Sequence, residues 1–355
     1  MASTVMITNA AEYDRAKELK HFDESKMGVK GLLDSGLTTI PKIFIHPPET
    51  LSDLKPASHA RPESHSIPII GISRCFDSGR RSAIIDQISR AAREVAFFQI
   101  TNHGIPLETI DRTMAATKAL HEKPLEIKAH FYRREVGSNV RYFSNVDLYH
   151  AKSASWRDTF YVKFGPNPLA PEELPEICRK EMVDWDKEVF RLSETLMGEG
   201  LGLSTDRFKE MTCFEGRTMI AQYYPHCPQP DLTVGLPSHT DPGVLTVLIP
   251  DQTGGCSLQV KYGGVWVGVK PVPGAIVINV GDLLQIISND EYKSVTHRVL
   301  ANSSSKPPVS IGVFLEPSNR EKLYGPRRNL YRRINQHFFD SFRYRSTGIN
   351  SSPKR

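Results

Sequence analysis

The sequence predicts a mainly β protein with helices, in which a jelly-roll barrel follows a helix-dominated first half. Three observations carry this prediction. Apolar residues recur with helical period in the first half, whereas after Arg217 the chain changes to short β-like runs that Gly and Pro interrupt. A histidine and an aspartate two residues apart precede several of these runs, and another histidine follows them, which is the order that a jelly roll requires.

The first half is expected to alternate helices with short strands. A strand-like apolar segment covers 66–70, a helix is expected over 81–95, and the strand Phe97 to Thr101 follows directly. The turn Asn102-His103-Gly104 leads into a weaker helical segment. The apolar residues that mark these helices are Ile84, Ile85, Ile88, Ala91, Ala92 and Val95, then Leu107, Ile110 and Met114, and later Trp185, Val189, Leu192 and Leu196.

The second half is expected to supply the barrel. Its runs are short, rich in β-branched residues and separated by turn residues, a pattern that is typical of a sandwich or barrel. The expected strands are Met219 to Tyr224, Leu245 to Ile249, Leu258 to Lys261, Val265 to Val269, Ala275 to Val280 and Val309 to Leu315.

Both ends of the chain differ from this core. The opening is charged and amphipathic, and the Pro-rich stretch Pro41 to Pro62 predicts a packed arm followed by an extended linker. The basic tail from Arg327 onward is expected to be solvated surface that covers the barrel. The predicted units are therefore an arm and linker over 1–65, a helical and mixed domain over 66–210, the metal-binding jelly roll over 211–320, and a C-terminal cover with the basic tail over 321–355.

Composition favours a small-molecule partner. The chain has 45 basic and 40 acidic residues, and a formal net charge of +5 is a weak basis for nucleic-acid binding. The five cysteines are widely spaced and show no CxxC pair, so they predict reduced thiols. No secretion signal and no run of about eighteen apolar residues is present, which predicts a cytoplasmic protein without membrane contact. We also expect the chain to be a monomer.

The candidate metal ligands are His239, Asp241 and His297. On an extended segment, His239 and Asp241 project from the same face because they lie two residues apart. His297 lies on a strand-like segment beyond several intervening strands. Two imidazoles and one carboxylate form the facial triad of non-haem Fe(II) sites, and zinc can use the same ligands.

Several short motifs accompany these residues. They are Phe97-Phe98-Gln99 with Asn102-His103-Gly104-Ile105, Trp156-Arg157-Asp158, Tyr223-Tyr224-Pro225 with Cys227-Pro228, Asn279-Val280-Gly281-Asp282, and His297-Arg298-Val299-Leu300-Ala301-Asn302. With His239-Thr240-Asp241, the set resembles the plant 2-oxoglutarate and Fe(II)-dependent dioxygenases, in particular the 1-aminocyclopropane-1-carboxylate oxidase homologues of specialised metabolism. The resemblance covers nearly the whole chain.

This resemblance implies a double-stranded β-helix core flanked by an N-terminal helical and mixed domain and packing helices. It also implies that His239, Asp241 and His297 hold the catalytic Fe(II). 2-Oxoglutarate is then the co-substrate and O2 the oxidant, with ascorbate as a further candidate cofactor. The expected reaction hydroxylates a small, mainly apolar metabolite; desaturation, ring closure and demethylation are variants.

One position departs from the family pattern. The far carboxylate of 2-oxoglutarate normally meets an Arg-x-Ser pair, and here Ser310 matches the serine while Pro308 stands in place of the arginine. Tyr224 matches another contact to that carboxylate. Lys306 and Arg298 are the nearby cations that are candidates to replace the arginine.

The remaining assignments are of substrate and structural residues, and the substrate residues come from the resemblance. Tyr142, Phe143 and Phe314 are placed near the substrate, although each is equally compatible with the core. Arg157 and Asp158 are expected to form a structural ion pair. Because of Pro308, two alternatives stay open: a metal- or ligand-binding relative without oxidative turnover, and a metal-assisted condensation, cyclisation or isomerisation that does not use 2-oxoglutarate.

Overall fold

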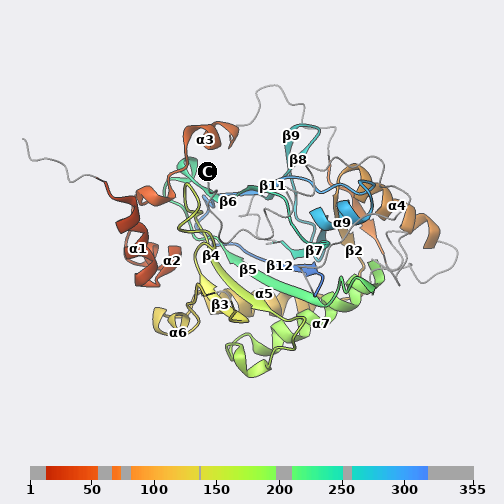
Figure 1. Cartoon of the computed structure of the whole chain (residues 1–355), viewed down its shortest axis with the longest axis horizontal. Helices are drawn as coiled ribbons and strands as arrows, with labels where there is room; N and C mark the ends of the chain where they lie inside the picture. The colour runs from red at the N-terminus through yellow and green to blue at the C-terminus, as the bar shows by residue number, and fades with distance from the viewer. Residues whose placement is uncertain are drawn as a thin grey trace, which may run out of the picture.

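Two β-sheets form the core of the protein in the computed structural model, which describes residues 13–54, 66–72, 81–135, 137–196, 210–250 and 258–318. The long sheet has the order β1-β2-β10-β7-β12-β5-β4-β3, and the short sheet has the order β6-β11-β8-β9. Figure 1 labels most of these strands. The strands are β1 Ile69–Gly71, β2 Phe97–Thr101, β3 Val140–Phe143, β4 Asp158–Lys163, β5 Gly216–Tyr223, β6 Val234–His239, β7 Leu245–Ile249, β8 Leu258–Tyr262, β9 Val265–Gly268, β10 Ile276–Val280, β11 His297–Leu300 and β12 Val309–Glu316.

The chain crosses between the two sheets repeatedly, as in a jelly roll. After β5 in the long sheet it enters β6 in the short sheet, returns to β7, and then supplies β8, β9 and β11 to the short sheet and β10 and β12 to the long one. Among the barrel strands, β10 therefore lies beside β7, β7 beside β12, and β12 beside β5, although none of these pairs is consecutive in sequence. The predicted mainly β fold with a jelly-roll core and flanking helices is confirmed.

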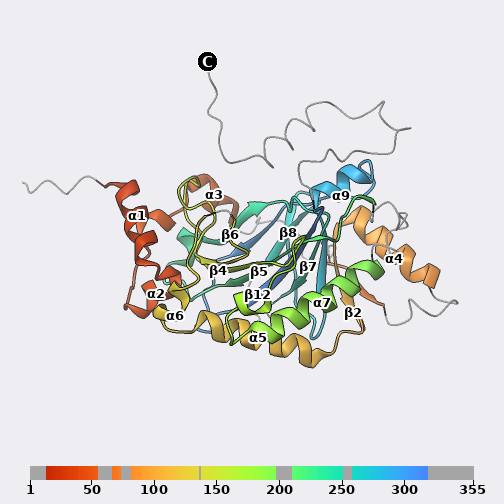
Figure 2. The same cartoon turned by 60° about the horizontal axis from the view of Figure 1, so that its bottom comes forward.

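The long sheet buries one face against helices. Helices α5 (Leu107–His121) and α7 (Arg179–Thr195) run beneath it (Figure 2). Alternate residues of β12, among them Ile311 and Val313, are fully buried in this helix-covered layer with Trp185. Because side chains alternate along a strand, the residues between them face the short sheet and the interior of the barrel.

Strands from the two predicted central units join in one sheet. β2 pairs in parallel with β1 and antiparallel with β10, so that Ile100 lies between Ile70 and Ile276. At the other edge, β4 pairs with β5. The helical first half therefore extends the barrel sheet at both edges instead of folding as a separate layer.

The expected helices and the strands of the barrel are present with shifts of a few residues at their ends. The remaining helical elements are α1 Arg15–Ser25, α2 Gly28–Asp34, η1 Lys42–Phe44, α3 Pro48–Leu54, α4 Arg81–Glu94, α6 Leu125–Ala129, η2 Pro171–Glu173, η4 Pro230–Leu232 and α9 Asp282–Ile287. No helix of the described ranges is long and apolar enough to cross a membrane.

Part of the Pro-rich stretch is helical. Pro48–Leu54 forms helix α3, which begins on a proline whose missing N–H is not needed in the first turn of a helix. The rest of the predicted linker, the basic tail, and Cys75 and Cys256 lie outside the described residues. Cys178, Cys213 and Cys227 are free and buried, as expected of reduced thiols.

Candidate metal centre

His239 and His297 are directly opposed on neighbouring strands. The β6–β11 ladder pairs the two residues, and their ring centroids lie 4.2 Å apart. Opposed residues of paired strands share a face of the sheet. Here that face is the barrel interior, where the ring of Phe97 packs edge-on against His297 at 5.1 Å.

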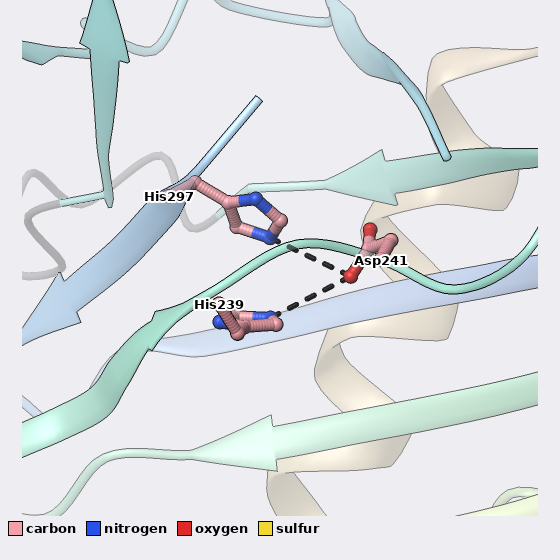
Figure 3. Close-up of side chains that lie close together, drawn as sticks. All are labelled: His239, Asp241 and His297. Atoms are coloured by element: carbon pink, nitrogen blue, oxygen red, sulfur yellow. Dashed lines mark ion pairs between the residues drawn. The ribbon is translucent and has the colours of Figure 1, made fainter. Parts of the chain in front are cut away.

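Asp241 completes the cluster from the loop that follows β6. Its Oδ1 atom lies 3.5 Å from Nε2 of His239 and 3.6 Å from Nε2 of His297 (Figure 3). Ligands on adjacent octahedral positions at about 2.1 Å from a metal lie about 3 Å apart, so a small inward movement of these atoms fits one ion. The structure therefore brings the three predicted ligands together, with their metal-binding atoms close to one another.

Hydrogen bonds fix which nitrogen of each imidazole faces the cluster. Nδ1 of His239 lies 2.9 Å from the carbonyl oxygen of Pro237, and Nδ1 of His297 lies 3.2 Å from that of Val295. A carbonyl oxygen only accepts, so Nδ1 carries the proton in both rings. The lone pair of each Nε2 is left for a metal, as in other His-ligated sites.

The Asp241 carboxylate is oriented in the same manner. Its Oδ2 accepts hydrogen bonds from Oγ1 of Thr246 at 2.6 Å and from Nδ2 of Asn279 at 2.7 Å. Thr246 and Asn279 are paired across β7 and β10, so the two donors stand side by side on the inner face. One carboxylate oxygen is thus occupied, and the other faces the histidines.

The loop that carries Asp241 is held by a close backbone contact. The amide of Asp282 donates to the carbonyl oxygen of Asp241 at 2.7 Å, and Oγ1 of Thr240 donates to the Asp282 carboxylate at 3.0 Å. A Cβ on Gly281 would lie 2.1 Å from the carbonyl oxygen of Gly243, so only glycine fits there. This contact explains the glycine in the Asn279-Val280-Gly281-Asp282 motif.

The charge state of the cluster suits a divalent cation. Burial opposes ionisation of Asp241, but the nearby His239 and His297 and the hydrogen bond from Thr246 hold the pKa of its carboxyl well below the usual range. Burial lowers the pKa of His297 to about 4, although Asp241 opposes that shift. At neutral pH the site therefore offers a carboxylate and a neutral His297, the forms that bind metal.

The residues predicted to bind the far carboxylate lie farther along the same inner face. Ser310 on β12 pairs with Gln222 on β5, which pairs with Thr159 on β4, and Oγ1 of Thr159 donates to Oε1 of Gln222 at 2.8 Å. Tyr224 follows β5 and packs within the barrel. The structure therefore places Tyr224 and Ser310 on a common face, beside the buried Pro308.

Neither cation suggested as a replacement for the missing arginine faces this region. Lys306 is exposed in the turn before β12. Arg298 points to the opposite face of β11 from His297, where its guanidinium pairs with Asp53 at 3.0 Å and stacks on the ring of Trp266 at 3.9 Å. Arg298 is thus part of the outer side of the short sheet.

The three aromatic residues placed near the substrate fall on two faces. Phe143 lies across from Thr159, and Phe314 lies across from Thr246, so both share the inner face with the metal cluster. Tyr142 points the other way: it is 1% exposed, lies in the core under the helices and packs against His121. Its position does not support a substrate contact, because neighbouring residues of a strand face opposite sides.

The same alternation separates Arg157 from Asp158. Asp158 accepts hydrogen bonds from the amides of Val29 and Lys30 at 2.8 and 2.9 Å, at the start of α2. Arg157 faces the barrel beside Tyr224, whose hydroxyl it hydrogen-bonds. The predicted ion pair between them was wrong. Thr246 and the role of Asn279 were also missed, since only strand pairing shows that both reach Asp241.

Comparison with known sequences shows which family the chain belongs to. Residues 216–317 match the 2OG-Fe(II) oxygenase superfamily, and residues 67–194 match the N-terminal region of non-haem dioxygenases, described as "non-haem dioxygenase in morphine synthesis N-terminal". The chain is 44% identical over 330 residues to 1-aminocyclopropane-1-carboxylate oxidase homolog 2 of Arabidopsis thaliana, which covers 90% of this chain and 88% of that protein. This chain belongs to the 2OG-Fe(II) oxygenases.

Other relatives of this plant 2OG-Fe(II) oxygenase support the same family assignment. A probable 2-oxoacid dependent dioxygenase of Arabidopsis thaliana is 39% identical and covers 97% of this chain and 94% of its own length. The crystal structure of JOX2 in complex with 2OG, Fe and JA superposes with a TM-score of 0.73 at 30% identity, over 89% of this chain and 92% of that one. Fe(II) and 2-oxoglutarate are thus the cofactor and co-substrate of the family, and the His-Asp-His cluster fits the iron.

Proposed function

We propose that this oxygenase hydroxylates a small, mainly apolar plant metabolite, with Fe(II) held by His239, Asp241 and His297. Two imidazoles and one carboxylate leave positions open for a co-substrate and O2. When bound, iron with 2-oxoglutarate and O2 supplies the chemistry that places one oxygen atom in a substrate C–H bond and leaves succinate and CO2. Desaturation, ring closure and demethylation are variants of that chemistry.

The observation that carries the substrate class is the aromatic lining beside the metal ligands. Phe314 is half-buried and opposed to Thr246, which donates to the carboxylate of Asp241, so Phe314 shares the inner face with the cluster. Phe143 and the half-buried Tyr161 and Ile220 continue this face on β3, β4 and β5. An apolar molecule gains free energy by covering such a surface, and its removal from water keeps the site dry.

The chain's own side chains then have separate tasks. Thr246 and Asn279 hold one oxygen of Asp241, so that the other oxygen faces the metal. Tyr224 and Ser310 hold the far carboxylate of 2-oxoglutarate through their hydroxyl groups. Phe143 and Phe314 orient the substrate. The JOX2 structure, a complex with 2OG, Fe and JA, supports a site that holds 2OG and iron together with a further ligand.

The test is a metabolite screen under heavy-isotope O2. Iron-loaded protein is incubated with 2-oxoglutarate and fractions of plant metabolites, and mass spectrometry follows products that gain one heavy oxygen atom. We expect such a product, formed in equal amount to succinate. Succinate formation that no metabolite stimulates, with no oxygenated product from any fraction, would contradict a hydroxylase of small metabolites.

A further inference from the structure

Arg157 is a buried cation that the iron chemistry described above does not use. It directly precedes β4 and is 7% exposed. Asp158, the next residue, points to the helix-covered face, and Thr159, two residues on, reaches Gln222 on the inner face. Arg157 therefore faces the barrel interior, on the side of the sheet that carries Ser310 and Phe314.

The guanidinium of Arg157 has little to balance its charge. Its polar contact is the hydroxyl of Tyr224, and its Nε atom is buried without a hydrogen-bond partner. Among the described residues it forms no ion pair within 4.0 Å; the carboxylate that influences it electrostatically is that of the exposed Asp147. A buried charge without a partner is costly, so this environment is suited to an anion that arrives with a ligand.

Strand register places Arg157 at the level of the missing arginine. Tyr223 pairs with Asp158 on one side and with Val309 on the other. One residue along each strand, Arg157, Tyr224 and Pro308 therefore stand side by side, and the Tyr224 amide donates to the Pro308 carbonyl oxygen at 3.1 Å. Arg157 and Pro308 are thus two strand spacings apart, which is about 10 Å. A long arginine side chain directed toward Tyr224 covers much of that distance.

We propose that Arg157 supplies the positive charge that binds the far carboxylate of 2-oxoglutarate, in place of the arginine that Pro308 replaces. Tyr224 and Ser310 add their hydroxyl groups to the same carboxylate. The inference rests on the proposed function, because it assumes that 2-oxoglutarate enters this barrel. The exposed Lys306 and the outward-facing Arg298 leave Arg157 as the cation in contact with Tyr224.

The test compares two keto acids that differ only at the far end. 2-Oxoglutarate carries the second carboxylate, and 2-oxopentanoate has a methyl group there. Their dissociation constants for the Fe(II)-loaded protein are measured by calorimetry without O2. The native chain should prefer 2-oxoglutarate by about 10- to 100-fold, which is the contribution of a charge-assisted hydrogen-bonded pair. In Arg157→Gln that preference should fall to a few-fold, with the affinity for 2-oxopentanoate little changed.

Three further variants separate binding from structure. Arg157→Lys should keep part of the preference, since the charge remains without the fork of the guanidinium. Pro308→Arg in the Arg157→Gln background should restore it, which a variant with a damaged fold cannot do. Arg141→Gln is the matched control: Arg141 is also a buried arginine on the inner face, but it stacks on Tyr161 at 4.0 Å, and its loss should leave the preference unchanged.

The outcomes are distinct. A native preference that survives in Arg157→Gln, or that disappears in Arg141→Gln instead, would overturn the assignment of Arg157 while leaving the oxygenase function intact. If neither keto acid binds the iron-loaded native chain, the proposed function itself fails. Loss of the preference for 2-oxoglutarate in Arg157→Gln, with its recovery when Pro308→Arg is added, supports the proposal.

Discussion

The barrel site has a metal end, formed by His239, Asp241 and His297, and a proposed carboxylate end, at Tyr224, Ser310 and Arg157. At the metal end each ligand is oriented by a direct hydrogen bond. At the carboxylate end a proline replaces the family's arginine, and a cation from a neighbouring strand lies beside Tyr224. A metal needs donor atoms at fixed positions within a fraction of an ångström, whereas a charge acts over several ångströms, so we expect the carboxylate end to tolerate a cation from another strand.

Removal of a metal ligand should have the largest effect. Asp241→Ala or His297→Ala leaves two of three ligands, and we expect loss of stoichiometric Fe(II) binding and of succinate formation. His103→Gln is the control, because His103 contacts the carbonyl oxygen of Gly274 at 2.8 Å, away from the cluster. Metal analysis of the purified variants after anaerobic loading checks this; full iron occupancy in both alanine variants would refute the assignment.

Removal of the groups that orient Asp241 should have the next largest effect. Thr246→Val keeps the shape of the side chain but removes its hydroxyl, and Asn279→Leu removes the amide that donates to the same oxygen. We expect each to weaken Fe(II) affinity or activity by about 10- to 100-fold. Competition with a coloured chelator measures the affinity. Native Fe(II) affinity and activity in both variants would show that the Asp241 carboxylate does not need these two hydrogen bonds.

A new arginine at the carboxylate end should act more modestly and leave the metal end untouched. Pro308→Arg should lower the KM for 2-oxoglutarate about threefold in the native chain and by about tenfold or more when Arg157 is glutamine, since cations that share one carboxylate are not additive. Fe(II) affinity should stay the same. Equal factors in the two backgrounds would mean that the two cations do not share an anion.

The smallest effects are expected from a pair of neighbours on opposite faces of β3. Phe143→Leu should raise the KM for the substrate a few-fold, because Phe143 lies on the inner face. Tyr142→Phe should leave that KM unchanged, since Tyr142 packs under the helices. Steady-state kinetics measures both KM values. A larger increase for Tyr142→Phe than for Phe143→Leu would indicate that the substrate contacts the helix-covered face, contrary to the account.

Sequence patterns predicted the metal end well because its chemistry is local and its spacing is strict. His239 and Asp241 lie in one short segment, and His297 follows at the right place in the strand order. Asn279 was part of a quoted motif, yet its donation to Asp241 depends on the pairing of β10 with β7. That register is a property of the folded sheet and is not encoded in any single segment.

The carboxylate end was predicted less well because it depends on which face each side chain takes. Arg157 and Asp158 were expected to pair, and Tyr142 and Phe143 were expected to share a cavity. Consecutive strand residues point to opposite faces, so neither pair can stand together. Applied to a strand through Asp158–Lys163, which was not anticipated, that rule would have placed Arg157 in the barrel from the sequence.

Turnover of 2-oxoglutarate tests the account most directly. Protein loaded with one equivalent of Fe(II) without O2 is mixed with 2-oxoglutarate and then exposed to O2, with and without candidate substrates, and succinate is measured against His297→Ala. The account predicts succinate from the native chain, more of it when a substrate is present, and none from the variant. No succinate under any condition from a chain that holds its iron would contradict an oxygenase that uses 2-oxoglutarate.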